Sequence, residues 1–107
     1  MDYSTITPAE LTAKRAAGES IRLIDVREPP EFEIAQLADS LLLPMSQINE
    51  WLGQLDPAEA IAVLCHHGIR SAHVCAYLVQ SGFQNVSNIA GGIDRWSAEV
   101  DQSLPRY

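Results

Sequence analysis

The sequence has little positive charge and no basic cluster. Only 7 of its 107 residues are Lys or Arg, against 14 Asp or Glu, so the formal net charge is -7. Nucleic acids and anionic membranes are bound through clusters of Lys and Arg that displace counterions. Lys14-Arg15 is the only adjacent basic pair. We therefore expect no nucleic acid and no membrane among the partners.

Long apolar runs and cysteines are also scarce. No apolar run approaches the roughly 20 residues that a membrane-spanning helix needs, and residues 1–5 lack the basic start and apolar stretch of a signal peptide. We expect a cytoplasmic protein. Cys65 and Cys75 are too few for a disulfide framework. Each is therefore either a small buried hydrophobe or a reactive thiol.

What the chain does have is an alternation of short apolar runs and amphipathic segments. Strands are predicted at residues 21–26, 40–43, 60–64 and 85–89, and helices from residue 8 to about 17 and at 31–37, 46–55, 71–80 and 93–100. Residues 60–64 are apolar at every position, which is typical of a central strand covered on both faces. The alternation predicts one α/β domain over residues 1–107 with a mainly parallel sheet.

The loop after this central strand carries the strongest candidate site. Cys65 stands at the carboxyl end of the strand, where open parallel sheets place their ligands, and Gly68 and Arg70 lead into a helix. The helix dipole, inward-pointing backbone N–H groups and the Arg70 guanidinium all favour a thiolate. Gly68 suits such a loop because it adopts positive φ without strain. The pattern predicts that Cys65 is a nucleophile.

The same loop is suited to an anionic sulfur atom. The N–H groups that stabilise a thiolate would also hold the outer sulfur of a persulfide. Arg70 would orient an anionic sulfur donor, and Ser71 would cap the helix or donate a hydrogen bond to the sulfur. The implied reaction is a double displacement, in which the thiolate takes a sulfane sulfur and a second nucleophile removes it. This chemistry requires no metal and no organic cofactor.

Three motifs resemble those of rhodanese-like sulfurtransferases. Residues 65–71, Cys-x-x-Gly-x-Arg-Ser, are similar to the active-site loop of the family. Residues 23–33 resemble its first motif and residues 81–96 its C-terminal motif. The resemblance spans nearly the whole chain. It implies a three-layer α/β/α fold with a central, mainly parallel sheet of about five short strands.

The resemblance also assigns roles. It makes Cys65 the persulfide carrier, with Asp25 and Arg27 as structural residues near the site. The loop that it assigns to substrate and persulfide binding consists of His66, His67, Gly68, Ile69, Arg70 and Ser71. The implied reaction moves a sulfane sulfur from a donor such as thiosulfate to cyanide or a thiol. Ala35-Gln36-Leu37 replaces the usual Gly-His-Ile, and this removes a histidine often near the site and leaves the substrate preference open.

Each candidate also has a structural interpretation. Cys65 could be a buried core cysteine, and Cys75, mid-helix among small apolar residues, is interpreted as core packing. No zinc site is predicted, because the spacing of cysteines and histidines fits no tetrahedral set. Arg70 is interpreted as facing an anion rather than solvent. Arg27 and Glu28 are interpreted as a salt-bridged or exposed pair.

Two other functions compete with sulfur transfer. Phosphatases and arsenate reductases of the cell-cycle dual-specificity phosphatase type share the architecture, but their Cys-x5-Arg loop is one residue longer than the loop from Cys65 to Arg70. The second is a binding, regulatory or sulfur-relay module that acts with a protein partner. A chain at -7 does not attract small dianions from a distance but steers in a basic partner. The oligomeric state is open, and residues 101–107 either pack or stay free.

Overall fold

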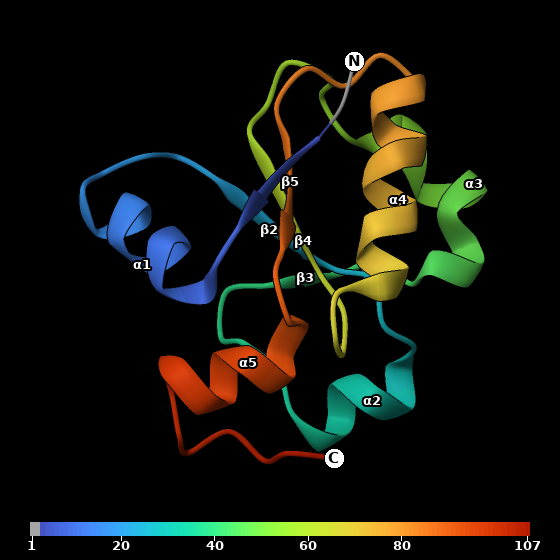
Figure 1. Cartoon of the computed structure of the whole chain (residues 1–107). Helices are drawn as coiled ribbons and strands as arrows, with labels where there is room; N and C mark the ends of the chain where they lie inside the picture. Colours follow the sequence, from blue (N-terminus) through green and yellow to red (C-terminus); the bar gives the residue numbers. More distant parts are fainter. Residues whose placement is uncertain (1–2) are drawn as a thin grey trace.

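Five parallel strands form one sheet in the order β1-β5-β4-β2-β3 in the computed structural model, which describes residues 3–107 (Figure 1). The strands are β1 (Ser4–Ile6), β2 (Arg22–Asp25), β3 (Leu41–Leu42), β4 (Ile61–Leu64) and β5 (Val86–Ile89). β4 lies at the centre and all four of its residues are buried, as its uninterrupted apolar sequence predicted. The predicted α/β fold with a parallel sheet is confirmed.

Helices cover both faces of the sheet. They are α1 (Pro8–Ala16), α2 (Pro29–Ile34), α3 (Ile48–Trp51), α4 (Ile69–Gln80) and α5 (Gly92–Glu99). Figure 1 shows α1 and α5 on one side of the sheet, α3 and α4 on the other, and α2 beyond the ends of the strands. α1 begins at a capping box, in which the Thr7 hydroxyl accepts from the Glu10 N–H and the Glu10 carboxylate accepts from the Thr7 N–H.

β4 divides the core into two clusters because successive side chains of a strand point to opposite faces. Ile61 and Val63 pack with residues of α3 and α4, chiefly Trp51, Val74, Cys75 and Leu78. Ala62 and Leu64 pack with residues of α1 and α5, chiefly Leu11, Ile93 and Trp96. Both clusters together fix the end of β4, and therefore the start of the loop that follows it.

Two differences from the sequence-based prediction are larger than a shift of a few residues at the end of an element. Residues 46–55, predicted as one helix, form the single α-helical turn of α3 between two 3₁₀ turns at Met45–Gln47 and Leu52–Gln54. Gly53 is a poor helix former. The Trp51 indole donates to the Pro44 carbonyl at 2.8 Å, and this ties the middle of the segment back to the residue before its first turn. β1 was not predicted, because three residues are too few to show an alternation.

Candidate active site

The loop between β4 and α4 lies at the carboxyl edge of the sheet. Cys65 follows the last residue of β4 directly and is 1% exposed. Gly68 ends the loop as the N-cap of α4 with a φ of 99°, a conformation that favours glycine. In Figure 1 the loop, drawn in yellow, extends beyond the sheet toward α2 and α5. The chain therefore places a cysteine where this class of sheet holds its chemistry.

The Cys65 sulfur is part of a closed ring of hydrogen bonds. The Gly68 N–H donates to Sγ at 3.1 Å, and the Ser71 hydroxyl lies 3.2 Å from Sγ. The Ser71 hydroxyl donates to Asn88 Oδ1 at 2.5 Å, and Asn88 Nδ2 donates to the Gly68 carbonyl at 3.1 Å. Asn88, on β5, therefore holds both of the groups that touch the sulfur.

Ser71 is not the helix cap. α4 begins two residues earlier than predicted, and its N-cap, Gly68, makes no side-chain capping bond. Ser71 instead faces the sulfur and is fully buried. A hydroxyl has one hydrogen, so the hydrogen given to Asn88 is not given to the sulfur at the same time. A Cys65 thiolate would compete with Asn88 for that hydrogen.

The start of α5 donates two backbone hydrogen bonds to the loop that carries Cys65. The Ile93 N–H donates to the Cys65 carbonyl at 2.8 Å, and the Asp94 N–H donates to the His66 carbonyl at 3.1 Å. Gly92, at a φ of 61°, brings its Cα so close that an added Cβ would lie 2.4 Å from both carbonyl oxygens. The absence of a side chain at Gly92 thus lets the start of α5 pack directly against the loop that carries Cys65.

Arg70 reaches α2. Its two terminal nitrogens donate to the Glu31 carboxylate at 2.6 and 2.8 Å, and Tyr107 donates its hydroxyl hydrogen to the same carboxylate at 2.8 Å. The hydrogen bonds from Arg70, and to a lesser degree the one from Tyr107, outweigh burial and lower the pKa of Glu31 to about 2. Glu31 in turn raises the pKa of Arg70. The anion that Arg70 faces is therefore a carboxylate of the chain itself.

The C-terminal residues pack against the loop. The Tyr107 ring stacks on His66 with centroids 3.9 Å apart and planes 7° apart, and His66 stacks on His67 at 3.8 Å. Arg106 pairs with Asp94 at 3.0 and 3.1 Å. Burial lowers the pKa of His66, and so does the neighbouring His67. The tail that the sequence left open is thus part of the wall around the site.

Asp25 and Arg27 form a buried ion pair behind that wall. Arg27 is fully buried and donates to Asp25 Oδ2 at 2.7 Å, to the Ala35 carbonyl at 2.6 Å and to the Tyr107 hydroxyl at 2.8 Å. Glu28 accepts instead from the Ser46 hydroxyl at 2.8 Å. The prediction of an exposed or salt-bridged pair between Arg27 and Glu28 is wrong, because the guanidinium turns inward to the end of β2.

The remaining predicted residues do not meet at the sulfur. The His67 side chain is exposed, and Ile69, the first residue of α4, is 70% exposed. Cys75 lies fully buried in the core, and burial raises the pKa of its thiol to about 12. Such a thiol stays protonated and unreactive at neutral pH.

His66, His67 and Asp94 bring potential metal-ligand atoms within 4.8 Å of one another. The two imidazole rings stack on each other, with planes 28° apart. Both oxygens of Asp94 accept from Arg106. This arrangement does not suit a metal ion.

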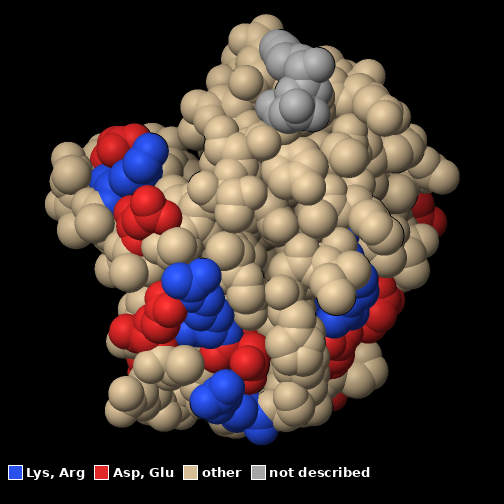
Figure 2. Space-filling view, in the orientation of Figure 1, with Lys and Arg blue, Asp and Glu red and all other residues tan. Residues whose placement is uncertain are grey.

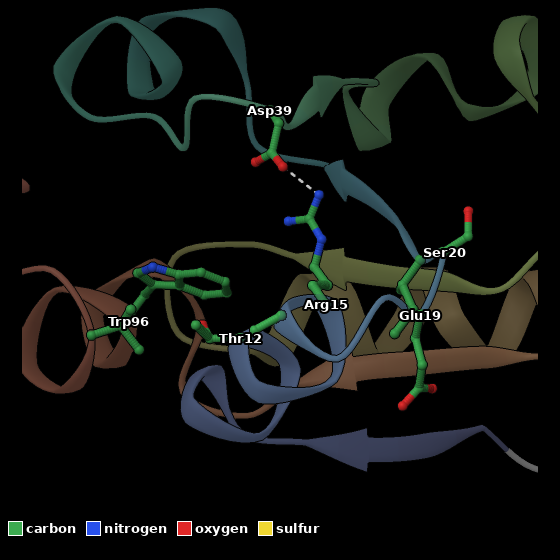
Figure 3. Close-up of a pocket in the computed structure, with 9 residues that line it drawn as sticks. Thr12, Arg15, Glu19, Ser20, Asp39 and Trp96 are labelled. Carbon is green, nitrogen blue, oxygen red and sulfur yellow. Dashed lines mark hydrogen bonds and ion pairs between the residues drawn. The ribbon is translucent and has the colours of Figure 1, made fainter.

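A cavity of about 620 Å³ lies away from the loop, beside α1 and α5 (Figure 3). Arg15 and Asp39 form an ion pair at its edge, and Trp96 contributes one wall. None of its lining residues belongs to the segment 65–71. Its volume therefore has no bearing on the chemistry of Cys65.

The sequence did not point to Asn88, Glu31 or Tyr107. One signal was available for Asn88, a polar residue near the carboxyl end of a strand next to the central one. Asn88 lies opposite Val63 in the sheet, and Val63 is two positions before Cys65. Glu31 and Tyr107 had no such signal, because neither follows a strand of the sheet and both reach the site only through side-chain contacts.

Replacing Asn88 by alanine is expected to lower the free energy of unfolding by about 2 kcal/mol, because the buried Ser71 hydroxyl and the Gly68 carbonyl would both lose a partner. Ser87→Ala is the matched control on the same strand, since the structure gives Ser87 no side-chain hydrogen bond within residues 3–107. Urea unfolding of both variants measures the difference. Equal losses would show that the ring contributes nothing to the fold.

Known proteins share this fold and sequence pattern. The sequence model of the Rhodanese-like domain family matches residues 7–99. A relative from Arabidopsis thaliana, "Rhodanese-like/PpiC domain-containing protein 12, chloroplastic", is 42% identical over 93 residues, which are 83% of this chain and 31% of that protein. "Thiosulfate sulfurtransferase GlpE" of Pseudomonas syringae is 33% identical over 101 residues, covering 94% of this chain and 93% of that protein.

A solved structure agrees with these relatives. The "Rhodanese-like Domain Protein from Staphylococcus aureus" superposes with a TM-score of 0.83 at 29% identity, and the match covers 97% of this chain and 98% of that one. The chain thus spans less than a third of the Arabidopsis protein but nearly all of the two bacterial ones. With the family match over most of its length, the chain belongs to the rhodanese-like sulfurtransferase family, as its three motifs predicted.

Proposed function

We propose that this protein transfers sulfane sulfur through a persulfide on Cys65, from a donor such as thiosulfate to a thiophilic acceptor such as cyanide or a thiol. The observation that carries the proposal is the position of Sγ at the end of β4, held by the Gly68 N–H and beside the Ser71 hydroxyl. The similarity to the thiosulfate sulfurtransferase of Pseudomonas syringae supports the same donor.

The reaction proceeds in two displacements. The Cys65 thiolate attacks the outer sulfur of thiosulfate, the S–S bond of the donor breaks, and sulfite leaves with the bonding pair. Cys65 then carries a terminal anionic sulfur within reach of the Gly68 N–H. Cyanide or a thiolate attacks that sulfur and the Cys65 thiolate leaves. Because Cys65 is 1% exposed, side chains that cover it must move when a donor arrives.

Sulfur relay to a protein partner is the second candidate. The Arabidopsis relative is a longer chain of which this one matches 31%, so the same domain occurs there joined to further sequence.

No helix within residues 3–107 is long and apolar enough to span a membrane. A cytoplasmic location stays part of the proposal.

Intact-mass measurement after incubation with thiosulfate tests the covalent chemistry. Wild type and Cys75→Ser are expected to gain one sulfur, about 32 Da, which cyanide then removes, whereas Cys65→Ser gains nothing. Cys75→Ser is the matched control because its thiol is buried in α4 with a pKa of about 12.

The proposal fails if folded wild-type protein with a free Cys65 thiol takes up sulfur from no sulfane donor. Hydrolysis of an aryl phosphate that disappears in Cys65→Ser would instead support the phosphatase alternative.

A further inference from the structure

The cation nearest the sulfur loop is already neutralised. Arg70 makes a two-point ion pair with Glu31, and the side chains are only 32% and 22% exposed. An anionic sulfur donor that uses Arg70 must therefore displace a carboxylate or share the guanidinium with it. Glu31 lies on α2, 39 positions before Arg70 in the chain. The ion pair therefore connects α2 with the start of α4, next to the loop that carries Cys65.

The Glu31 carboxylate is held in this place by more than Arg70. The Glu28 N–H donates to Oε1 at 3.2 Å, which closes the N-terminal turn of α2, and the Tyr107 hydroxyl donates to Oε2 at 2.8 Å. Tyr107 is itself fixed by Arg27 and by its stack on His66. With a pKa of about 2, Glu31 is ionised at neutral pH. A fixed negative charge therefore belongs to the site.

No other cation near the loop is free to compensate this charge. Within residues 3–107, Arg27 is paired with Asp25, Arg106 with Asp94 and Arg95 with Glu99. Figure 2 shows one face of the molecule, on which the basic patches adjoin acidic ones. Burial lowers the pKa of His66, which keeps that ring neutral at neutral pH. A dianion that approaches Cys65 therefore meets no unpaired arginine near the loop among the residues that the structure describes.

We propose that Glu31 determines the substrate class of the site by occupying Arg70, so that monoanionic sulfane donors, such as alkanethiosulfonates and persulfides, are used in preference to the dianion thiosulfate. This inference rests on the proposed function, since it concerns the donor that loads Cys65. In the preferred reaction the Cys65 thiolate attacks the outer sulfur of R–SO₂–S⁻, the donor S–S bond breaks, and the sulfinate R–SO₂⁻ leaves with the bonding pair.

Thiosulfate and methanethiosulfonate are a matched pair of probes, because a methyl group in the second replaces one charged oxygen of the first. The measurement is the second-order rate of Cys65 persulfide formation with each donor at low salt. Glu31→Gln is expected to speed loading from thiosulfate about tenfold and from methanethiosulfonate about threefold, since the repulsion that it removes scales with the charge of the donor. Glutamine keeps one acceptor oxygen, which can still serve the Arg70 and Glu28 donors that share Oε1.

Glu33→Gln is the control, because it removes the same charge from the same helix at an exposed position that the structure does not pair within residues 3–107. It is expected to change either rate less than twofold. Equal effects of the two variants, or slower loading of Glu31→Gln from both donors, would overturn the assignment.

A second measurement needs no variant and so does not depend on folding. The ratio of the thiosulfate rate to the methanethiosulfonate rate in wild type is expected to rise about threefold between 0.02 and 0.5 M salt. Salt screens the repulsion by Glu31, and this repulsion is larger for the dianion than for the monoanion. A constant ratio would also overturn the assignment. If neither donor loads Cys65 at all, the proposed function has failed instead, and the mass measurement records that separately.

Discussion

Arg27→Met is expected to lower the free energy of unfolding by about 4 kcal/mol, although the residue lies outside the sulfur loop. Arg27 is fully buried and donates to both oxygens of Asp25, at 3.0 Å and 2.7 Å. Methionine fills much of the volume but leaves the Asp25 carboxylate buried without its counter-ion, and the Ala35 carbonyl without its donor. An uncompensated buried charge is among the most costly defects a core can carry.

Arg22→Met at the other end of β2 is the matched control. Arg22 pairs with Glu59 at 2.8 Å, and its side chain is 45% exposed, so solvent already screens the pair. A loss below about 1 kcal/mol is expected there. Urea unfolding measures the loss of unfolding free energy in both variants. Similar losses would mean that the buried pair contributes no more to stability than a surface pair. Asp25→Asn combined with Arg27→Met should restore part of the stability, because it removes the stranded charge.

Four of the five strands could be predicted because their causes are local. The apolar run of β4 and the capping box of α1 are each written in a few consecutive residues. The position of Cys65 at the end of the central strand follows from the same run. Loop residues placed by backbone alone, such as Gly68 with its positive φ, could be anticipated for the same reason.

The surroundings of the sulfur could not be predicted in this way. The contact of Tyr107 with Arg27 joins residues 80 positions apart, and that of Ser71 with Asn88 joins residues 17 positions apart. Such contacts depend on how α2, β5 and the C-terminal tail are placed around the loop. Arg27 and Glu28 show the limit clearly, since adjacent opposite charges suggested a pair, whereas Arg27 turns inward to Asp25 and Glu28 reaches Ser46.

Two of these long-range contacts bear on function differently. The ring through Asn88 fixes the groups that touch the sulfur, and so affects any sulfur donor equally. The pair of Glu31 with Arg70 sets the charge that a donor meets before it reaches the sulfur. The site therefore separates a part that holds the reacting atom from a part that selects what approaches it. Variants of Asn88 should alter stability, and variants of Glu31 should alter selectivity.

Gly92→Ala is expected to cost about 4 kcal/mol of folding free energy and to abolish sulfur loading of Cys65. The added Cβ would lie 2.4 Å from the carbonyl oxygens of Cys65 and His66, which are backbone atoms and cannot rotate away. Relief requires α5 and the loop to separate, and this breaks the bonds that the Ile93 and Asp94 N–H groups donate to those carbonyls.

Gly82→Ala separates this contact from backbone strain. Gly82 has a φ of 96°, also in the left-handed region, but an added Cβ there would meet nothing within 4 Å. It is expected to cost only about 1 kcal/mol and to leave sulfur loading intact. Urea unfolding and intact mass after incubation with thiosulfate measure the two effects for each variant. If Gly92→Ala were no worse than Gly82→Ala, the close seat of α5 against the loop would not be what holds Cys65 in position. The expected gap of about 3 kcal/mol would instead show that the sulfur loop depends on a glycine in the next helix.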